Sequence, residues 1–160
     1  MAIYHFEAKV ISRGKGQSAI ASASYRSGEK LYSERYNKFN FYGRSVAPKT
    51  FILKPSNAPD WTLNRQKLWN EVEKIEKSKN ARLARDFILA LPSELNEEEQ
   101  EELLLDYCQE NFVNHGMVAD IAIHRDKDGN PHAHIMTTNR PFKENGDWGT
   151  RQKKVYHYDE

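Results

Sequence analysis

The chain has 160 residues, of which 38% are hydrophobic and 29% charged, and its formal net charge is +1 at pH 7. This length is sufficient for one folded domain with a core, and the periodic hydrophobic pattern excludes a disordered chain. No segment approaches the roughly 20 apolar residues of a membrane-spanning helix, and the N-terminus lacks the basic and then apolar pattern of a signal peptide. The single cysteine, Cys108, excludes an internal disulfide. We expect Cys108 to be buried in a helix and the protein to be cytoplasmic.

The small net charge conceals two oppositely charged halves. Residues 1–85 contain 17 Lys and Arg against 7 Asp and Glu, a net of +10, whereas residues 86–160 contain 7 against 16, a net of −9. A basic half indicates a polyanionic partner. The alternative is that the fold mixes the two kinds of charge again on the surface, and the sequence alone leaves both readings open.

The first third of the chain predicts a strand, a helix and an aromatic segment. Residues 3–12 alternate as a strand does. A helix rich in small residues is expected over 18–26, with Ser18 as its N-cap and Gly28 as its stop. Residues 30–42 carry aromatic side chains with polar residues between them, which is compatible with a two-stranded ribbon or with a mobile loop.

Further strands and helices follow in alternation. In chain order we expect a strand over 46–53, a helix over 63–77, a strand over 81–91, a helix from Asn96 to Gly116, and strands over 117–123 and 132–138. Asn96 and Glu99 are spaced as a capping box. This order predicts the α+β class, with a mainly antiparallel sheet flanked by helices. We expect the helices to cover one face and the histidines to project from the other face or from its edge.

Residues 124–134, HRDKDGNPHAH, contain half of the six histidines of the chain. His132 and His134 are two residues apart, so on a strand they point to the same face. The run DKDGN predicts a hairpin turn that brings His124 beside them. Three neutral imidazoles that converge can bind a divalent metal ion. The alternative is three ordinary surface histidines.

Tyr25 ends the helix of small residues in the string SASYRSGEK. Because the neighbouring residues of the helix are small, the Tyr25 hydroxyl can be exposed to solvent, so Tyr25 is a candidate nucleophile. The alternative is a half-buried packing tyrosine. Arg13 and Lys15 precede this helix, Arg26 and Lys30 follow Tyr25, and aromatic residues come next. Cations for phosphates together with aromatic rings for stacking predict a surface that binds single-stranded nucleic acid.

Three segments of the chain resemble the MobA/MobL-type conjugative relaxases, which include transfer proteins of broad-host-range plasmids from Gram-positive bacteria. They are AIYHFEAKVISRGKGQSAIASASYRSGEKL, ARDFILALPSEL and IHRDKDGNPHAHIMTTNR, and the resemblance runs from residue 1 to about residue 151. It implies an HUH endonuclease fold and a transesterase that nicks one DNA strand at an origin of transfer. It also implies that residues 1–160 are one relaxase domain from the N-terminal part of a longer protein. The expected partners are single-stranded or hairpin DNA and other conjugation proteins, such as a coupling protein.

Carried over position by position, the resemblance implies that Tyr25 is the nucleophile and that His124, His132 and His134 bind a metal ion. Imidazole ligands suit zinc, manganese, cobalt or nickel, while phosphoryl transfer often uses magnesium or manganese. Three other functions stay open: a rolling-circle replication initiator, a zinc hydrolase of small molecules, and a non-catalytic DNA-binding protein with a structural metal.

Asp86, in the string ARDF, falls where many members of that family carry glutamate. The resemblance implies that this acid activates the tyrosine or orients a histidine. Alternation along the strand places Asp86 on one face with Ile88 and Ala90, and we expect that face to be the histidine face. A salt bridge to Arg82 or Arg85 is the alternative role.

Overall fold

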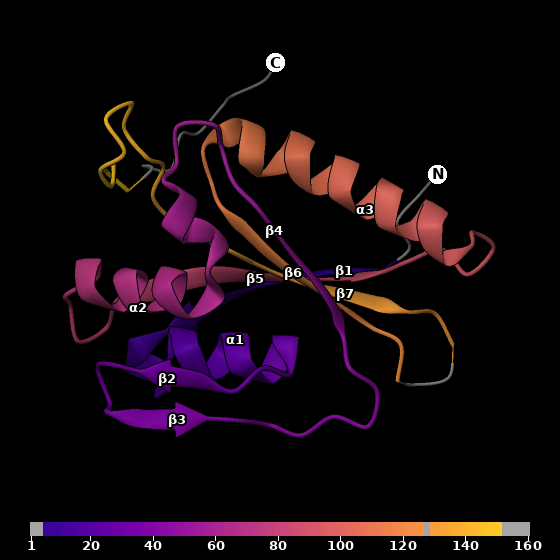
Figure 1. Cartoon of the computed structure of the whole chain (residues 1–160), viewed down its shortest axis with the longest axis horizontal. Helices are drawn as coiled ribbons and strands as arrows, with labels where there is room; N and C mark the ends of the chain where they lie inside the picture. The colour runs from indigo at the N-terminus through magenta and orange to yellow at the C-terminus, as the bar shows by residue number, and fades with distance from the viewer. Residues whose placement is uncertain (1–4, 127–128, 152–160) are drawn as a thin grey trace, which may run out of the picture.

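The computed structural model describes residues 5–126 and 129–151, and its centre is a five-stranded sheet (Figure 1). The strands stand in the order β1-β5-β7-β6-β4. Every neighbouring pair is antiparallel, which confirms the predicted sheet. Their bounds are His5–Ser12 for β1, Lys49–Leu53 for β4, Arg82–Ala90 for β5, Ala119–His124 for β6 and His132–Thr137 for β7.

Three α-helices, three short 3-10 helices and a small ribbon complete the described part of the chain. The α-helices are α1 (Ala19–Ser27), α2 (Arg65–Ile75) and α3 (Glu97–Asn111). The 3-10 helices span Arg13–Lys15, Asp60–Leu63 and Val113–His115. The ribbon pairs β2 (Leu31–Ser33) with β3 (Lys38–Asn40). In the part of the chain that the structure describes, no helix is both long and apolar enough to span a membrane.

Local signals placed both ends of α1 and the start of α3 correctly, whereas α3 ends at Asn111 and Gly116 instead ends the 3-10 helix Val113–His115. The Ser18 side chain accepts a hydrogen bond from the Ala21 amide, and Gly28 ends α1 with a left-handed φ of 76°. Asn96 and Glu99 form the predicted capping box at the start of α3. These caps satisfy backbone groups that a helix terminus leaves without a partner. They therefore set where α1 and α3 begin.

Helices cover both faces of the sheet, which corrects the expectation of a single covered face (Figure 1). On one face, Cys108 of α3 packs with Leu89 and Ile135; on the other, Ile20 of α1 packs with Met136. The second face is covered although it is partly polar, because Arg65 and Trp69 of α2 donate to the buried carboxylate of Asp120 on β6. Cys108 is buried as expected, and burial raises its pKa to about 12.

Residues 30–42 contain the ribbon and not a mobile loop, and the ribbon lies against α1 and α2. The Ser24 hydroxyl lies 2.9 Å from the Asn40 carbonyl oxygen. From α2, the Asn70 amide donates to the Tyr32 carbonyl and accepts from the Glu34 amide. These contacts fix the ribbon beside the helix that carries Tyr25.

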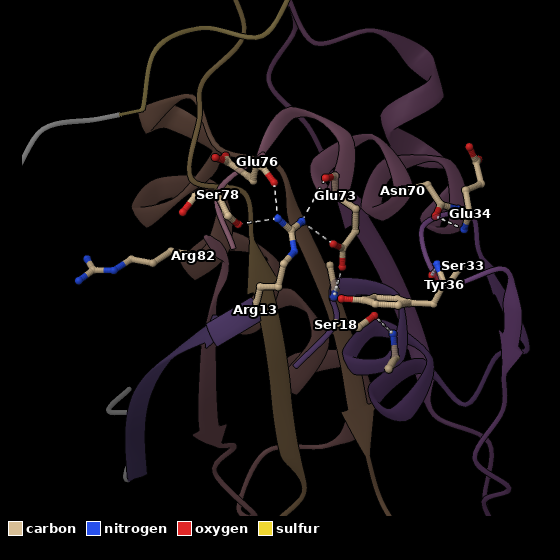
Figure 2. Close-up of polar contacts among 12 residues, drawn as sticks. Arg13, Ser18, Ser33, Glu34, Tyr36, Asn70, Glu73, Glu76, Ser78 and Arg82 are labelled. Atoms are coloured by element: carbon tan, nitrogen blue, oxygen red, sulfur yellow. Dashed lines mark hydrogen bonds and ion pairs between the residues drawn. The ribbon is translucent and has the colours of Figure 1, made fainter. Parts of the chain in front are cut away.

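Arg13 lies in the interior, between α1 and the end of α2 (Figure 2). Its guanidinium donates to the Glu73 carboxylate and to the carbonyls of Glu76 and Ser78, each at 2.7 Å. The second oxygen of Glu73 accepts from the Ala19 amide at 2.8 Å. This corrects the expectation of a DNA contact at Arg13, because local sequence displays its charge but not its burial.

Removing the Glu73 carboxylate should destabilise the fold strongly. Glu73→Ala leaves Arg13 buried without its counter-ion and the first amide of α1 without an acceptor, so we expect a loss of about 3–5 kcal/mol. Urea unfolding measures it. Glu71→Ala is the matched control on the same helix, because Glu71 contacts only surface lysines in its ion pairs and should cost less than about 1 kcal/mol. Equal losses in the two variants would contradict a structural role for the Arg13–Glu73 pair.

Candidate active site

Strands β6 and β7 bring the three histidines together at one end of the sheet. His124 pairs directly with His132, and His134 lies opposite Ala122 on one side and Ile88 on the other. Residues that face each other across an antiparallel pair project to the same face. The register therefore agrees with the hairpin that the sequence predicts; residues 127 and 128 of the turn lie outside the described residues.

A pocket of about 290 Å³ opens beside the histidines, which we call the histidine pocket. Its lining comprises Tyr25, Arg44, Ile88, His124, Asp126, Asn130, His132 and His134. Tyr25 stands at the C-terminal end of α1 and is 51% exposed. The fold thus places the predicted nucleophile and the three predicted metal ligands around one cavity.

The imidazole rings themselves are not arranged around a common centre. The rings of His124 and His134 lie over each other, with centroids 4.1 Å apart and an interplanar angle of 31°. Among residues 5–126 and 129–151, no group of three or more His, Cys, Asp or Glu side chains is placed to hold a metal ion. The metal site therefore stays a prediction, supported by strand register and not by ring geometry.

Burial keeps two of the imidazoles neutral. It is the largest cause that lowers the pKa of His124. It also lowers the pKa of His134 to about 3, with added effects from His124, Arg26 and Arg44. A metal ion requires the unprotonated lone pair of an imidazole. Both rings therefore have the charge state that coordination requires at neutral pH.

Asp86 lies on the histidine face of β5, as predicted from its position two residues before Ile88. It is 3% exposed, and both carboxylate oxygens accept from Arg26, at 3.0 Å from Nε and 2.5 Å from Nη2. Its partner is therefore Arg26 and neither Arg82 nor Arg85. Arg85 is adjacent on the strand and points to the opposite face, and Arg82 is exposed. In this structure Asp86 positions α1.

Arg44 is a residue of the site that sequence reasoning did not select. Its Nε and Nη2 donate to the Tyr25 carbonyl at 3.0 and 2.8 Å, and its guanidinium carbon lies 4.8 Å from the centroid of the Tyr25 ring. Nη1 also lies 3.4 Å from Asp126. In the sequence Arg44 is one more cation of a basic segment, so only the fold distinguishes it.

The remaining predicted DNA contacts divide into two groups. Lys15 and Lys30 are exposed, and the Lys30 ammonium lies 4.6 Å from the centroid of the Phe39 ring. The Arg26 side chain is 18% exposed and paired with Asp86. The two lysines are accessible to a polyanion, whereas Arg26 is held by the protein.

Comparison with known proteins gives consistent matches. A model described as the MobA/MobL family matches residues 17–160. Conjugal transfer protein TraA of Agrobacterium fabrum is 40% identical over 158 residues, which are 91% of this chain and 14% of that protein. Probable mobilization protein MobA of Bifidobacterium longum is 36% identical over 164 residues, 100% of this chain and 29% of that protein. The chain thus spans less than a third of each of these relatives.

A solved structure also matches. It is described as "Molecular Basis of Vancomycin Resistance Transfer in Staphylococcus aureus" and aligns with a TM-score of 0.87 at 33% sequence identity. The alignment covers 98% of this chain and 80% of that chain. The predicted fold class is therefore confirmed.

The contact between His124 and Arg26 predicts the protonation state of the metal-free pocket. His124 Nε2 lies 2.7 Å from the Arg26 carbonyl oxygen, and a carbonyl only accepts, so the neutral ring should carry its proton on Nε2. A long-range ¹H–¹⁵N spectrum at pH 7 should show this tautomer. A proton on Nδ1 alone, or a charged ring at pH 7, would contradict the contact.

The lowered pKa of His134 should make the free energy of unfolding depend on pH. The unfolded ring takes up its proton near its ordinary pKa of 6.5, whereas the folded ring does so only at about 3. The unfolded state therefore binds more protons between these values, and the contribution of His134 to the free energy of unfolding should fall as the pH drops through that window.

Proposed function

The chain belongs to the MobA/MobL family, and from this membership and the histidine pocket we propose that it is a relaxase of the HUH endonuclease fold. Its reaction would be a transesterification that nicks one DNA strand at a plasmid origin of transfer, which it would bind as single-stranded or hairpin DNA. The observation that carries the proposal is the convergence of Tyr25 and three histidines on one cavity. Relatives named for conjugal transfer and mobilization support it.

The proposed reaction conserves the phosphodiester energy. The Tyr25 oxygen attacks phosphorus, the oxygen–phosphorus bond forms, and the bond from phosphorus to the 3′ oxygen breaks. The phenol loses its proton to a base or to solvent, and the departing 3′ oxygen gains one. The product is a 5′-phosphotyrosyl ester and a free 3′-hydroxyl, which can later attack the ester and reseal the strand. Attack by water would not permit that reversal.

Positive charge at the pocket suits this chemistry. A phenol is a weak nucleophile unless its surroundings favour loss of its proton, and negative charge grows on the phosphate during attack. Arg44 lies over the Tyr25 ring and lines the same cavity as the histidines. A cation placed beforehand near developing negative charge is an effective source of transition-state stabilisation.

The proposal includes a divalent metal ion held by His124, His132 and His134, with manganese or magnesium the first candidates and zinc, cobalt or nickel the others. The donor chemistry fits, because three imidazoles line one cavity; the rings would have to turn to share one ion. Because His124 Nε2 contacts the Arg26 carbonyl, its Nδ1 is left as the ligand atom, and metal-binding histidines are commonly oriented in this way. When bound, such an ion supplies Lewis acidity to a non-bridging phosphate oxygen.

The wider setting also belongs to the proposal. A nicked strand has to be passed to the next step of transfer, so we place other conjugation proteins, such as a coupling protein, among the partners. Plasmid DNA lies in the cytoplasm of bacteria, so the protein would act there. Lys15 and Lys30 are exposed and therefore available to the DNA backbone.

Replacing the nucleophile should abolish covalent attachment. Tyr25→Phe keeps the ring beside Arg44 but removes the attacking oxygen, so it should form no adduct with DNA. The assay incubates protein with a labelled single-stranded oligonucleotide from the origin of transfer and manganese, followed by a denaturing gel. Tyr32→Phe is the matched control, because the Tyr32 hydroxyl bonds to Asn37 in the ribbon, and its adduct should persist. A Tyr25→Phe adduct at the wild-type level would exclude Tyr25. Absence of any wild-type adduct would favour a non-catalytic DNA-binding protein.

Each histidine of the pocket should be needed for metal binding. His124→Ala, His132→Ala and His134→Ala should each weaken manganese binding by about 100-fold or more, since even groups that only orient metal ligands are worth roughly 10- to 100-fold. Calorimetry on the metal-free chain measures the affinity, and circular dichroism checks the fold. His115→Ala, outside the pocket, should bind as the wild type does. Unchanged affinity in the pocket variants would remove the metal from the proposal.

A further inference from the structure

A second pocket, of about 580 Å³, lies along α1, and Tyr25 lines it as well. We call it the ribbon pocket, because one side is formed by α1 with Ser18 and Ser22, and the other by Tyr36, Lys38 and Asn40 of the ribbon segment. Tyr25 is therefore the shared boundary between the histidine pocket and the ribbon pocket. The ribbon pocket therefore runs along α1 from Ser18 at the start of the helix to the proposed nucleophile near its end.

Exposed aromatic rings line the ribbon pocket. Tyr36 is 44% and Tyr42 41% exposed. The Tyr42 ring meets the Tyr25 ring edge to face, with centroids 5.5 Å apart. Figure 2 shows the Tyr36 side chain extending toward Ser18 at the start of α1, and both residues line the cavity. Aromatic faces left open to solvent beside a groove are the stacking platforms that proteins use for unpaired bases.

Asn40 adds a hydrogen-bonding group without a partner. It is 8% exposed and lines the ribbon pocket, and its backbone carbonyl accepts from Ser24. Its side-chain amide nitrogen has no hydrogen-bond partner in the described part of the chain. A buried polar group left in this state costs about 1–3 kcal/mol. Asn is a side chain that reads base edges through paired hydrogen bonds, so a base would satisfy it.

The charges separate a place for a base from a place for a phosphate. Where the pocket meets the N-terminus of α1, the amide groups of the helix already have partners. The Glu73 carboxylate accepts from the Ala19 amide, and the Ser18 hydroxyl accepts from the Ala21 amide (Figure 2). An anion would gain little there and would be repelled by Glu73. At the ribbon end, Lys38 is exposed and available to a phosphate. The part of the pocket beside the N-terminus of α1 therefore suits a neutral, planar group.

We propose that the ribbon pocket binds a nucleobase of single-stranded DNA, from a nucleotide that neighbours the scissile phosphate. Tyr36 stacks on the base, the Asn40 amide bonds to its edge, and Lys38 contacts the adjoining backbone. The pocket would then select which base lies beside the nick. This assignment rests on the proposed function, because it is the shared Tyr25 that relates the base to the reacting phosphate.

The test compares DNA with bases and DNA without them. The probes are a labelled oligonucleotide of ten thymidines, one of ten adenosines, and an abasic backbone of the same length and charge, each titrated with the full chain by fluorescence anisotropy. Tyr36→Ala and Asn40→Ala should each weaken the tighter-binding base-bearing probe by about tenfold, as expected for loss of one stacking or base-edge contact. Affinity for the abasic probe should stay within about twofold of the wild type. Lys38→Ala should weaken base-bearing and abasic probes by similar factors.

Phe6→Ala is the matched control. Phe6 is likewise an exposed aromatic residue, at 51%, but it lies on β1 and packs against Phe87 on the sheet face that α3 covers. The variant should leave binding of every probe unchanged. If Tyr36→Ala and Asn40→Ala bind the base-bearing probes as the wild type does, or lose the abasic probe to the same extent, the base pocket is overturned. Should thermal melting show that Asn40→Ala is unfolded, the surface variant Tyr36→Ala decides alone.

The two proposals fail separately. If the Tyr36 and Asn40 variants lose affinity only for base-bearing DNA while the wild type forms no covalent adduct, the base pocket is supported and the relaxase reaction is rejected. If the wild type forms an adduct at Tyr25 while Tyr36→Ala and Asn40→Ala show no base-dependent loss of affinity, the reaction is supported and the base pocket is rejected.

Discussion

The ion pair between Arg26 and Asp86 is the contact on which the site depends. It joins the C-terminal end of α1 to the middle of β5, the strand that pairs with β7. The same Arg26 holds His124 through its carbonyl, and Arg44 holds the Tyr25 carbonyl from the loop after the ribbon. Three contacts on two consecutive residues thus fix the tyrosine relative to the histidine strands. The opposite end of α1 is held by Glu73, so the helix is anchored at both termini.

The arginines and lysines of the basic half have different roles. Arg13, Arg26 and Arg65 each donate to a buried carboxylate and connect elements that are distant in sequence. The planar, forked guanidinium suits such pairs, while the ammonium of lysine is strongly hydrated and stays at the surface. Lys15 and Lys38 are accordingly exposed. The excess of positive charge therefore overstates the number of cations that a polyanion can reach.

Tyr25 divides the functional surface into two chemical environments. On one side are imidazoles that burial keeps neutral and the cation of Arg44; on the other are open aromatic faces and the unpaired amide of Asn40. The first environment suits a phosphate under attack and the second a base. A nucleotide chain that crosses Tyr25 presents both groups in succession. The geometry thus connects the proposed reaction to a means of choosing where on a strand it occurs.

The sequence by itself determined the features that depend on local periodicity and turn chemistry. The caps of α1 and α3, the antiparallel sheet, and the shared face of His124, His132 and His134 follow from spacings of two to four residues and from a turn signal. The tertiary structure decided the features that depend on partners far along the chain. Asp86 finds Arg26 at a separation of 60 residues, and Arg13 finds Glu73 at the same separation. Helices cover both sheet faces, and the buried Asp120 of β6 finds its partner in Arg65 of α2 at a separation of 55 residues. Periodicity shows which side chains share a face, but only packing determines what each face meets.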